Sequence, residues 1–214
     1  KKLTIFRNPP GNGLLRTLTI REGKNTDEFM INFVTSGDAF PFADELVQLC
    51  REALPTLTSL YHTVIRVQKG TRTMIEERLL YGKPFITDAI VLTDGTKLTF
   101  TIHPQAFFQP NTVQAGVLYT TVLDFLMRDH KRHGLIYDLY CGTGTIGMFC
   151  ATCADKVIGV EVGASAIENA RQSAMDNHLQ NIDFFVGDAT KLLLDDTGPL
   201  QAQPDALIVD PPRA

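Results

Sequence analysis

Hydrophobic positions in the first hundred residues of this chain form short apolar runs or alternate with polar residues. Both patterns are typical of β-strands. The expected strands cover residues 14–22, 29–34, 60–68, 89–93 and 97–102. The last two flank Asp94-Gly95, a residue pair that favours a tight hairpin turn. This part of the chain is therefore expected to consist mainly of strands.

One segment of the same region has helical spacing. Residues 41–54 place apolar side chains on one face, and Pro41 suits the first turn of a helix while Asp38 is a possible cap. A single helix among several strands indicates a mixed architecture. We therefore expect a smaller, strand-rich α+β domain over residues 1–101.

From residue 102 onward the pattern becomes an alternation of helices and strands. Asn111 is placed to cap a helix whose apolar residues continue to Leu126. Further helices are expected at 145–153 and 163–177, a shorter apolar segment at 189–194, and strands at 135–139, 156–160, 181–186 and 205–210. Strands that alternate with helices pair in parallel and bind ligands at their carboxyl ends. We therefore expect an α/β domain with a partial parallel sheet over residues 102–214.

Composition narrows the possible partners. The chain has 214 residues, 44% hydrophobic residues and a net charge of −4, so no global field attracts nucleic acid. Any RNA must then meet a local patch, for which residues 128–133 are a candidate; the alternative is a solvated helix end. No apolar run is long enough to span a membrane, and no signal peptide is visible. We expect a cytoplasmic protein that has no membrane or obligate protein partner.

The four cysteines do not suggest a disulfide framework. Cys150 and Cys153 have the spacing of a redox or metal pair, but no second pair accompanies them. Their position on the helix at 145–153 favours packing in the core. We therefore expect no metal site.

Candidate chemistry begins where the first strand of the α/β region ends. Residues 138–147 contain Gly142, Gly144 and Gly147, and a loop without side chains allows a ligand to approach the backbone. The helix that follows offers free N–H groups to polar ligand atoms. This pattern predicts a nucleotide-like ligand.

Acidic residues lie at or just after the ends of four consecutive strands of this region. They are Asp138, Glu161, Asp188 and Asp210. Each one alone could be a helix cap, but together they predict a ligand-binding site at the carboxyl ends of the strands. A carboxylate at Glu161 can accept both hydroxyls of a ribose, and Asp188 can accept from an adenine amino group.

The glycine spacing also matches the dinucleotide fingerprint, so NAD is an alternative ligand. A carboxylate at Asp138 would repel a pyrophosphate, whereas it would attract the sulfonium and amino groups of S-adenosylmethionine (SAM). The Asp-Pro-Pro-Arg turn at 210–213 lies where methyltransferases of this architecture place a substrate-facing loop. These two features favour SAM.

Three motifs together resemble the RNA uridine-5-methyltransferase family, which acts on 23S ribosomal RNA and transfer RNA. They are Asp-Leu-Tyr-Cys-Gly-Thr-Gly-Thr-Ile-Gly at 138–147, Phe-Phe-Gln at 107–109 and Asp-Pro-Pro-Arg at 210–213. The resemblance is strong over residues 96–214. It implies a Rossmann-like class I SAM methyltransferase domain that transfers a methyl group to C5 of a uridine in RNA. The chain departs from the family pattern at His103, Ala106 and Pro110.

The resemblance also implies roles for individual residues. SAM contacts are implied for Gln109, Tyr140, Thr145, Glu161, Asp188 and Asp210. Asp210 and Gln109 are also implied to position the substrate, and Phe107 to lie near the target uridine. Phe108 is either a second contact of this kind or a core residue.

Family members form a covalent bond between a cysteine and C6 of the base. That cysteine and the general base lie downstream of the Asp-Pro-Pro-Arg turn in the family, so both are expected beyond Ala214. The chain begins with Lys1 and is expected to be an excerpt that is inactive alone. The alternatives are a SAM methyltransferase acting on another nucleobase atom and a noncatalytic nucleotide-binding module.

Overall fold

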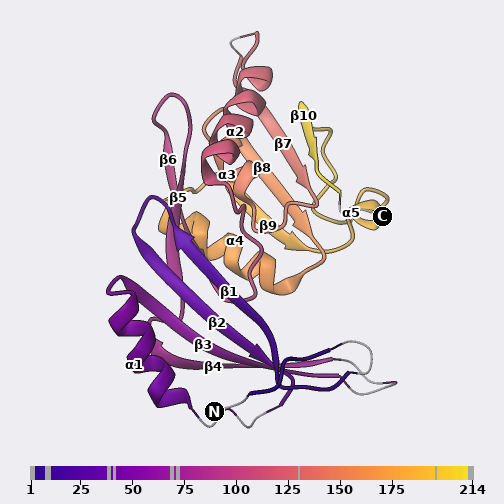
Figure 1. Ribbon diagram of the computed structural model, residues 1–214. Helices are drawn as coiled ribbons and strands as arrows, with labels where there is room; N and C mark the ends of the chain where they lie inside the picture. The colour runs from indigo at the N-terminus through magenta and orange to yellow at the C-terminus, as the bar shows by residue number, and fades with distance from the viewer. Residues whose placement is uncertain are drawn as a thin grey trace. The chain divides into compact units, whose positions relative to one another are not determined.

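A computed structural model describes residues 3–7, 11–37, 40, 42–67, 70, 73–129, 131–195 and 197–211. The chain divides into two compact units (Figure 1). The first comprises Lys1–Asp88 with Ile102–Gln105, and the second comprises Ala89–Thr101 with Ala106–Ala214.

The first unit is a four-stranded sheet with one helix. Its elements are β1 (Leu15–Gly23), β2 (Glu28–Thr35), α1 (Ala43–Ala53), β3 (Leu57–Arg66) and β4 (Met74–Gly82), and the strand order is β1-β2-β3-β4. The pairs β1/β2 and β3/β4 are antiparallel, whereas β2 and β3 are parallel because α1 connects them. Ile31, Leu57 and Leu60 form the core beneath α1. Asp38 and Pro41, the expected cap and first-turn residues, lie outside the described residues.

A hairpin of β5 (Ile86–Val91) and β6 (Lys97–Ile102) follows, as the Asp94-Gly95 pair predicted. Its apolar residues Ile90, Leu92, Leu98 and Phe100 are buried in the core of the second unit. Residues 89–101 therefore group with the second unit, whereas the domain boundary predicted from the sequence, between residues 101 and 102, assigned them to the first. Side-chain packing across long sequence distances causes this difference.

The second unit contains a four-stranded parallel sheet. Its strands are β7 (His133–Leu139), β8 (Ala154–Glu161), β9 (Ile182–Val186) and β10 (Ala206–Val209), in the order β10-β7-β8-β9. The helices are α2 (Thr112–Leu126), α3 (Thr145–Cys150), α4 (Ala164–Asp176) and the short α5 (Ala189–Leu192). The expected Rossmann-like α/β architecture with a partial sheet is confirmed.

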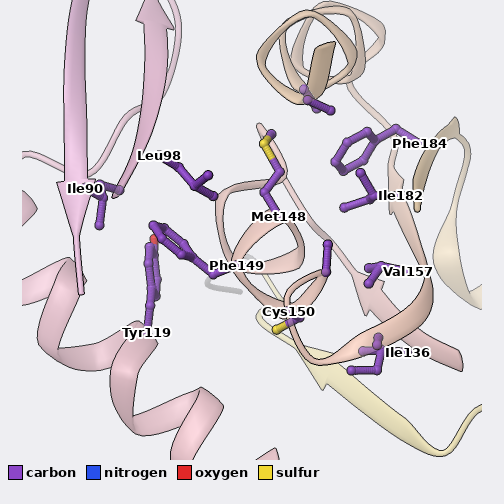
Figure 2. Packing of buried hydrophobic residues seen from close by; sticks show 14 of the residues in the cluster. Ile90, Leu98, Tyr119, Ile136, Met148, Phe149, Cys150, Val157, Ile182 and Phe184 are labelled. Atoms are coloured by element: carbon purple, nitrogen blue, oxygen red, sulfur yellow. The ribbon is translucent and has the colours of Figure 1, made fainter. Parts of the chain in front are cut away.

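Alternating side chains of these strands supply two cores, one on each face of the sheet. Ile136, Val157 and Ile182 pack with residues of α2, α3 and α4 in the larger one (Figure 2). Tyr137 and Val160 point to the other face and pack near α5. Burial on both faces is what a parallel sheet requires.

The predicted cap of α2 is confirmed, because the Asn111 side chain accepts a hydrogen bond from the Gln114 amide at 3.1 Å. This bond satisfies one of the free N–H groups of the first turn. Within the part of the chain that is described, no helix is long and apolar enough to cross a membrane.

Candidate functional site

Four acids lie at the carboxyl ends of the four parallel strands, on the side of the sheet that is called its carboxyl edge below. Asp210 follows β10, Asp138 lies near the end of β7, Glu161 ends β8, and Asp188 follows β9. Because all four strands run in the same direction, their carboxyl ends share this edge, and the strand order places the acids as Asp210, Asp138, Glu161 and Asp188. The sheet thus brings together residues that are up to 72 positions apart in the sequence.

The loop from β7 to α3 has an unusual backbone. Tyr140, Gly142 and Gly144 have φ angles of 62°, 55° and 75°. The left-handed region is unfavourable for tyrosine, and such strain is concentrated at functional sites. A Cβ atom at Gly142 would have no neighbour within 4 Å, so the backbone at Gly142 borders open space. A ligand can therefore approach the main chain there.

Glu161 links two backbone segments of this loop region. Its Oε2 accepts from the Gly142 amide at 3.2 Å, and its Oε1 accepts from the Gly163 amide at 3.0 Å. Glu161 therefore lies beside the glycine loop. An ionised carboxylate has about four acceptor positions, so this half-buried group retains capacity for ligand hydroxyls.

Asp138 acts on the loop itself. Its side chain is 1% exposed, and Oδ2 accepts a hydrogen bond from the Gly147 amide at 2.9 Å in the first turn of α3. Burial raises the pKa of Asp138 to about 7, and the nearby charge of Asp210 adds to the increase. We expected this carboxylate to face a cationic ligand, but it is buried against α3 and fixes the start of that helix.

Asp188 and Tyr140 meet at the start of α5. Asp188 Oδ1 accepts from the amides of Thr190 at 3.0 Å and Lys191 at 3.4 Å, so it caps this helix. Among the described residues, Oδ2 has no hydrogen-bond partner. The Tyr140 hydroxyl lies 3.4 Å from the Thr190 hydroxyl. Capping, the alternative considered for a single acid, therefore applies to Asp188, while one oxygen remains for a ligand.

Thr145 and Gln109 meet at a residue that sequence analysis missed. Tyr119 of α2 is 1% exposed, and its hydroxyl lies 3.1 Å from that of Thr145 and within hydrogen-bonding reach of the Gln109 side chain. Tyr119 has the spacing of a core residue on α2, and no signal in the sequence separates it from its apolar neighbours.

The Phe-Phe-Gln segment has two different phenylalanines. Phe107 is 70% exposed, as a residue that contacts a substrate can be. Phe108 packs against Phe100, with ring centroids 5.7 Å apart, and joins the core cluster. The core alternative for Phe108 is therefore confirmed.

Asp210 is exposed at the end of β10, where its amide donates to the Leu139 carbonyl at 3.5 Å. Its charge acts on both Asp138 and Tyr119. Asp210 thus lies near both groups, at the carboxyl end of the strand next to β7. Pro212, Arg213 and Ala214 of the Asp-Pro-Pro-Arg turn lie outside the described residues.

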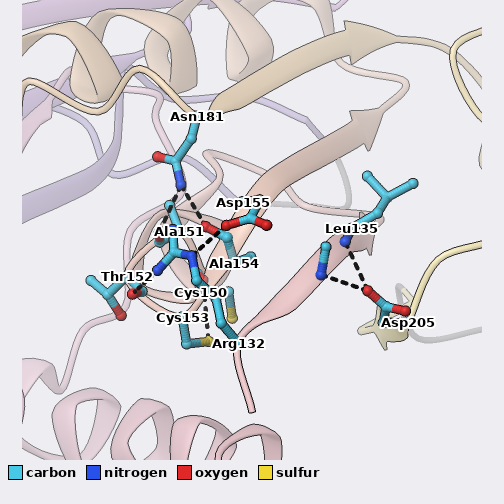
Figure 3. A network of polar contacts seen from close by, with 11 residues as sticks. Arg132, Leu135, Cys150, Ala151, Thr152, Cys153, Ala154, Asp155, Asn181 and Asp205 are labelled. Atoms are coloured by element: carbon cyan, nitrogen blue, oxygen red, sulfur yellow. Dashed lines mark hydrogen bonds and ion pairs between the residues drawn. The ribbon is translucent and has the colours of Figure 1, made fainter.

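The basic segment at 128–133 lies at the other edge of the sheet. β7 begins at His133, and the Arg132 side chain donates to the Thr152 carbonyl at 3.1 Å, to the Ala154 carbonyl and to Asp155 (Figure 3). These bonds fix the loop that precedes β8. The segment is therefore remote from the acids, which favours its structural interpretation over an RNA patch; His130 lies outside the described residues.

The cysteines are unsuited to nucleophilic chemistry. Cys150 and Cys153 are buried, and the Cys153 thiol donates to the Cys150 carbonyl at 3.3 Å, so their predicted place in the core is confirmed. Burial raises the pKa of all four thiols. A thiol must lose its proton to become a strong nucleophile, and the raised pKa values disfavour that loss.

The parallel sheet, with the glycine loop and the acid that ends β8 together at the carboxyl ends of its strands, defines a Rossmann-like nucleotide-binding type of domain. Comparison with known proteins agrees. The family model of tRNA (uracil-5-)-methyltransferase matches residues 42–192. The chain belongs to this SAM-dependent family.

Individual relatives support this assignment. The chain is 34% identical to an RNA methyltransferase of Clostridium tetani over 100% of its length and 45% of the relative's. It is 36% identical to an RNA methyltransferase of Staphylococcus aureus over 99% of its length and 45% of the relative's. The chain therefore spans about half the length of the curated relatives it matches.

Solved structures are also similar. The tRNA (uracil-54, C5)-methyltransferase of Pyrococcus abyssi, in complex with S-adenosyl-L-homocysteine, has a TM-score of 0.71 and 29% identity over 98% of this chain and 47% of its own. The tRNA m1G37 methyltransferase of M. jannaschii has a TM-score of 0.51 and 14% identity, over 94% of this chain and 53% of its own. The second likeness concerns the fold alone.

Proposed function

We propose that this chain is the cofactor-binding part of an enzyme that methylates C5 of a uridine in RNA, with SAM as the methyl donor. The observation that carries the proposal is the position of Glu161, whose carboxylate binds the backbone of the glycine loop beside open space at Gly142. A carboxylate at this place can accept the two ribose hydroxyls of SAM.

The remaining cofactor contacts follow from the same carboxyl edge of the sheet. Asp188 Oδ2 would accept from the adenine amino group. Tyr140, Thr145, Gln109 and Asp210 would surround the methionine part of the cofactor. Bound SAM supplies an electrophilic methyl group on a positively charged sulfur. The carboxylates of this edge favour that positive charge.

The acceptor base would lie next to the Phe-Phe-Gln segment. Phe107 offers an exposed aromatic ring on which a flipped base can stack. The Gln109 carboxamide carries both donors and an acceptor, so it can bond to the polar edge of uracil. The Pyrococcus abyssi relative acts on uracil 54 of tRNA, so tRNA is the first acceptor to test, and ribosomal RNA is the second.

C5 of uridine needs activation before it can accept a methyl group. In the proposed mechanism a cysteine thiolate bonds to C6, and the displaced electron pair gives C5 the character of a carbanion. C5 then bonds to the methyl group, whose bond to sulfur breaks. A general base removes the C5 proton, the bond between C6 and sulfur breaks, and the thiolate leaves. Uracil thereby regains its double bond between C5 and C6.

No thiol of this chain fits that role, because burial raises the pKa of Cys50, Cys141, Cys150 and Cys153. We infer that the nucleophile and the base come from residues outside these 214. The 214 residues alone would then bind SAM but transfer no methyl group. RNA as the acceptor also fits the cytoplasmic location expected from the sequence.

The test uses the protein expressed from its complete gene. It is incubated with SAM carrying a labelled methyl group and with unmodified tRNA or ribosomal RNA, and the nucleosides are analysed by mass spectrometry. The proposal predicts labelled 5-methyluridine in one of the two RNAs and none with the 214-residue chain alone. Label on cytidine or on an amino nitrogen, or no transfer to either RNA, would contradict it.

A further inference from the structure

Tyr119 is a buried polar group that the proposed chemistry does not yet use. It lies in the middle of α2, points from that helix toward α3, and packs its ring on Phe149 with centroids 5.7 Å apart (Figure 2). Its hydroxyl contacts Thr145 and reaches Gln109. Thr145 opens α3 directly after the glycine loop, whereas Gln109 belongs to the Phe-Phe-Gln segment, so one hydroxyl joins the two segments.

We infer that Tyr119 is a positioning residue of the methyltransferase site, which orients Gln109 and Thr145 toward SAM and the acceptor base. This inference rests on the proposed function. Tyr119 is 1% exposed, so it acts through the two side chains that it contacts.

The hydrogen-bond chemistry of the hydroxyl supports this role. A phenolic hydroxyl has one proton to donate and lone pairs to accept with, so it can bond to both neighbours at once. A buried hydroxyl without a partner is unfavourable, because it loses its bonds to water on folding. The bond to Thr145 is therefore retained, and together with the interaction with Gln109 it restricts how these two side chains can turn.

The charge state of Tyr119 suits the same role. Burial raises its pKa, and the charges of Asp138 and Asp210 raise it further, while the bonds to Thr145 and Gln109 act in the opposite direction. The phenol therefore keeps its proton at neutral pH and remains a donor. An ionised phenolate would only accept, and one of the two bonds would be lost.

The helix that carries Tyr119 is seated firmly. A Cβ atom at Gly116 would lie 2.1 Å from the Val91 carbonyl oxygen. The backbones of α2 and β5 are therefore so close at this point that only glycine fits at position 116. The Thr120 hydroxyl also accepts from the Thr93 amide at 3.0 Å. These contacts on either side of Tyr119 set the rotation of α2, so the hydroxyl has a defined position.

The chain offers a matched control for the test. Tyr137 is also 1% exposed, and its hydroxyl donates to the Ala202 carbonyl at 2.6 Å. It belongs to the core on the other face of the sheet. Tyr119→Phe and Tyr137→Phe therefore each remove one buried hydroxyl and keep the ring, but only the first touches the site.

The experiment measures SAM affinity and methyl-transfer kinetics of the protein from its complete gene. We expect Tyr119→Phe to weaken SAM binding or to lower kcat by about tenfold, the effect of one lost hydrogen bond of about 1.4 kcal/mol. Tyr137→Phe should change neither. The double variant Tyr119→Phe/Gln109→Ala should lose little more SAM affinity or kcat than Gln109→Ala alone, because both substitutions disrupt the same interaction.

Three results would overturn the inference. They are wild-type affinity and kcat in Tyr119→Phe, equal losses in both tyrosine variants, and losses that multiply fully in the double variant. A wild-type protein that binds SAM but makes no 5-methyluridine refutes the proposed acceptor, and the SAM-affinity measurements then still decide on Tyr119. A wild-type protein that does not bind SAM overturns both.

Discussion

Replacing Gly147 with alanine should disrupt the bond between Asp138 and α3. A Cβ atom at this position would lie 2.7 Å from Asp138 Oδ2 and 3.3 Å from Ile182 Cδ1. The carboxylate cannot move into solvent, because Asp138 is only 1% exposed. The extra methyl group must therefore displace either the carboxylate or the first turn of α3.

The size of the effect follows from three contributions. Loss of the 2.9 Å bond from the Gly147 amide to the carboxylate costs about 1.5–3 kcal/mol. Overpacking costs about 1–3 kcal/mol. Alanine favours the helix over glycine by about 1 kcal/mol. The net expectation is a loss of about 1.5–5 kcal/mol in the free energy of unfolding.

Urea denaturation of the 214-residue chain, followed by circular dichroism, measures this loss at an unchanged m-value. Gly163→Ala is the control, because a Cβ atom there has its nearest neighbours, Ala166 Cβ and Glu161 Oε1, at an ordinary contact distance of 3.6 Å. We expect the control to change stability by about 0.5 kcal/mol or less. A loss below about 1 kcal/mol in Gly147→Ala, or equal losses in both variants, would refute the reasoning about Asp138.

Two further predictions concern charged side chains at opposite edges of the sheet. Burial raises the pKa of Asp138 from 3.8 to about 7, so the folded state binds more protons between these values and stability falls as the pH rises through this window. Asp138→Asn should abolish that fall, which amounts to about 4 kcal/mol at most; urea titrations at pH 4 and pH 8 that show the same fall in the variant would contradict this. Arg132→Ala should lower stability by about 1 kcal/mol through its lost carbonyl bonds. It should leave RNA affinity unchanged in a filter-binding assay, and a weaker, less salt-dependent binding would instead identify the basic segment as an RNA contact.

The alternation of helices and strands could be predicted because each element of the second unit has a local signal. The apolar strands are short and separated by helical spacing, and Asn111 marks the start of α2 by its own side chain. β4 was not predicted, because it has no such local signal. Its sequence Met-Ile-Glu-Glu-Arg-Leu-Leu-Tyr-Gly carries charges and is largely exposed, so no alternation of buried and polar residues identifies it.

Only some contacts between distant residues could be predicted from the sequence. The strand order places Glu161 at the loop, and the parallel pairing that the pattern predicts was enough to anticipate this. The burial of Asp138 against Gly147 depends on how α3 packs, and the link from Tyr119 to Thr145 depends on how two helices meet. Spacing along the sequence contains neither relation, because both arise from packing in three dimensions.

The central claim is that the carboxyl edge holding Glu161 binds SAM. Isothermal titration of SAM into the protein from its complete gene, compared with Glu161→Ala and with Glu168→Ala on the exposed side of α4, tests it most directly. Loss of charge-assisted bonds worth about 1.5–3 kcal/mol predicts binding weakened by about 10- to 150-fold in Glu161→Ala, with wild-type affinity in Glu168→Ala. Unchanged SAM affinity in Glu161→Ala would contradict the assignment of the site.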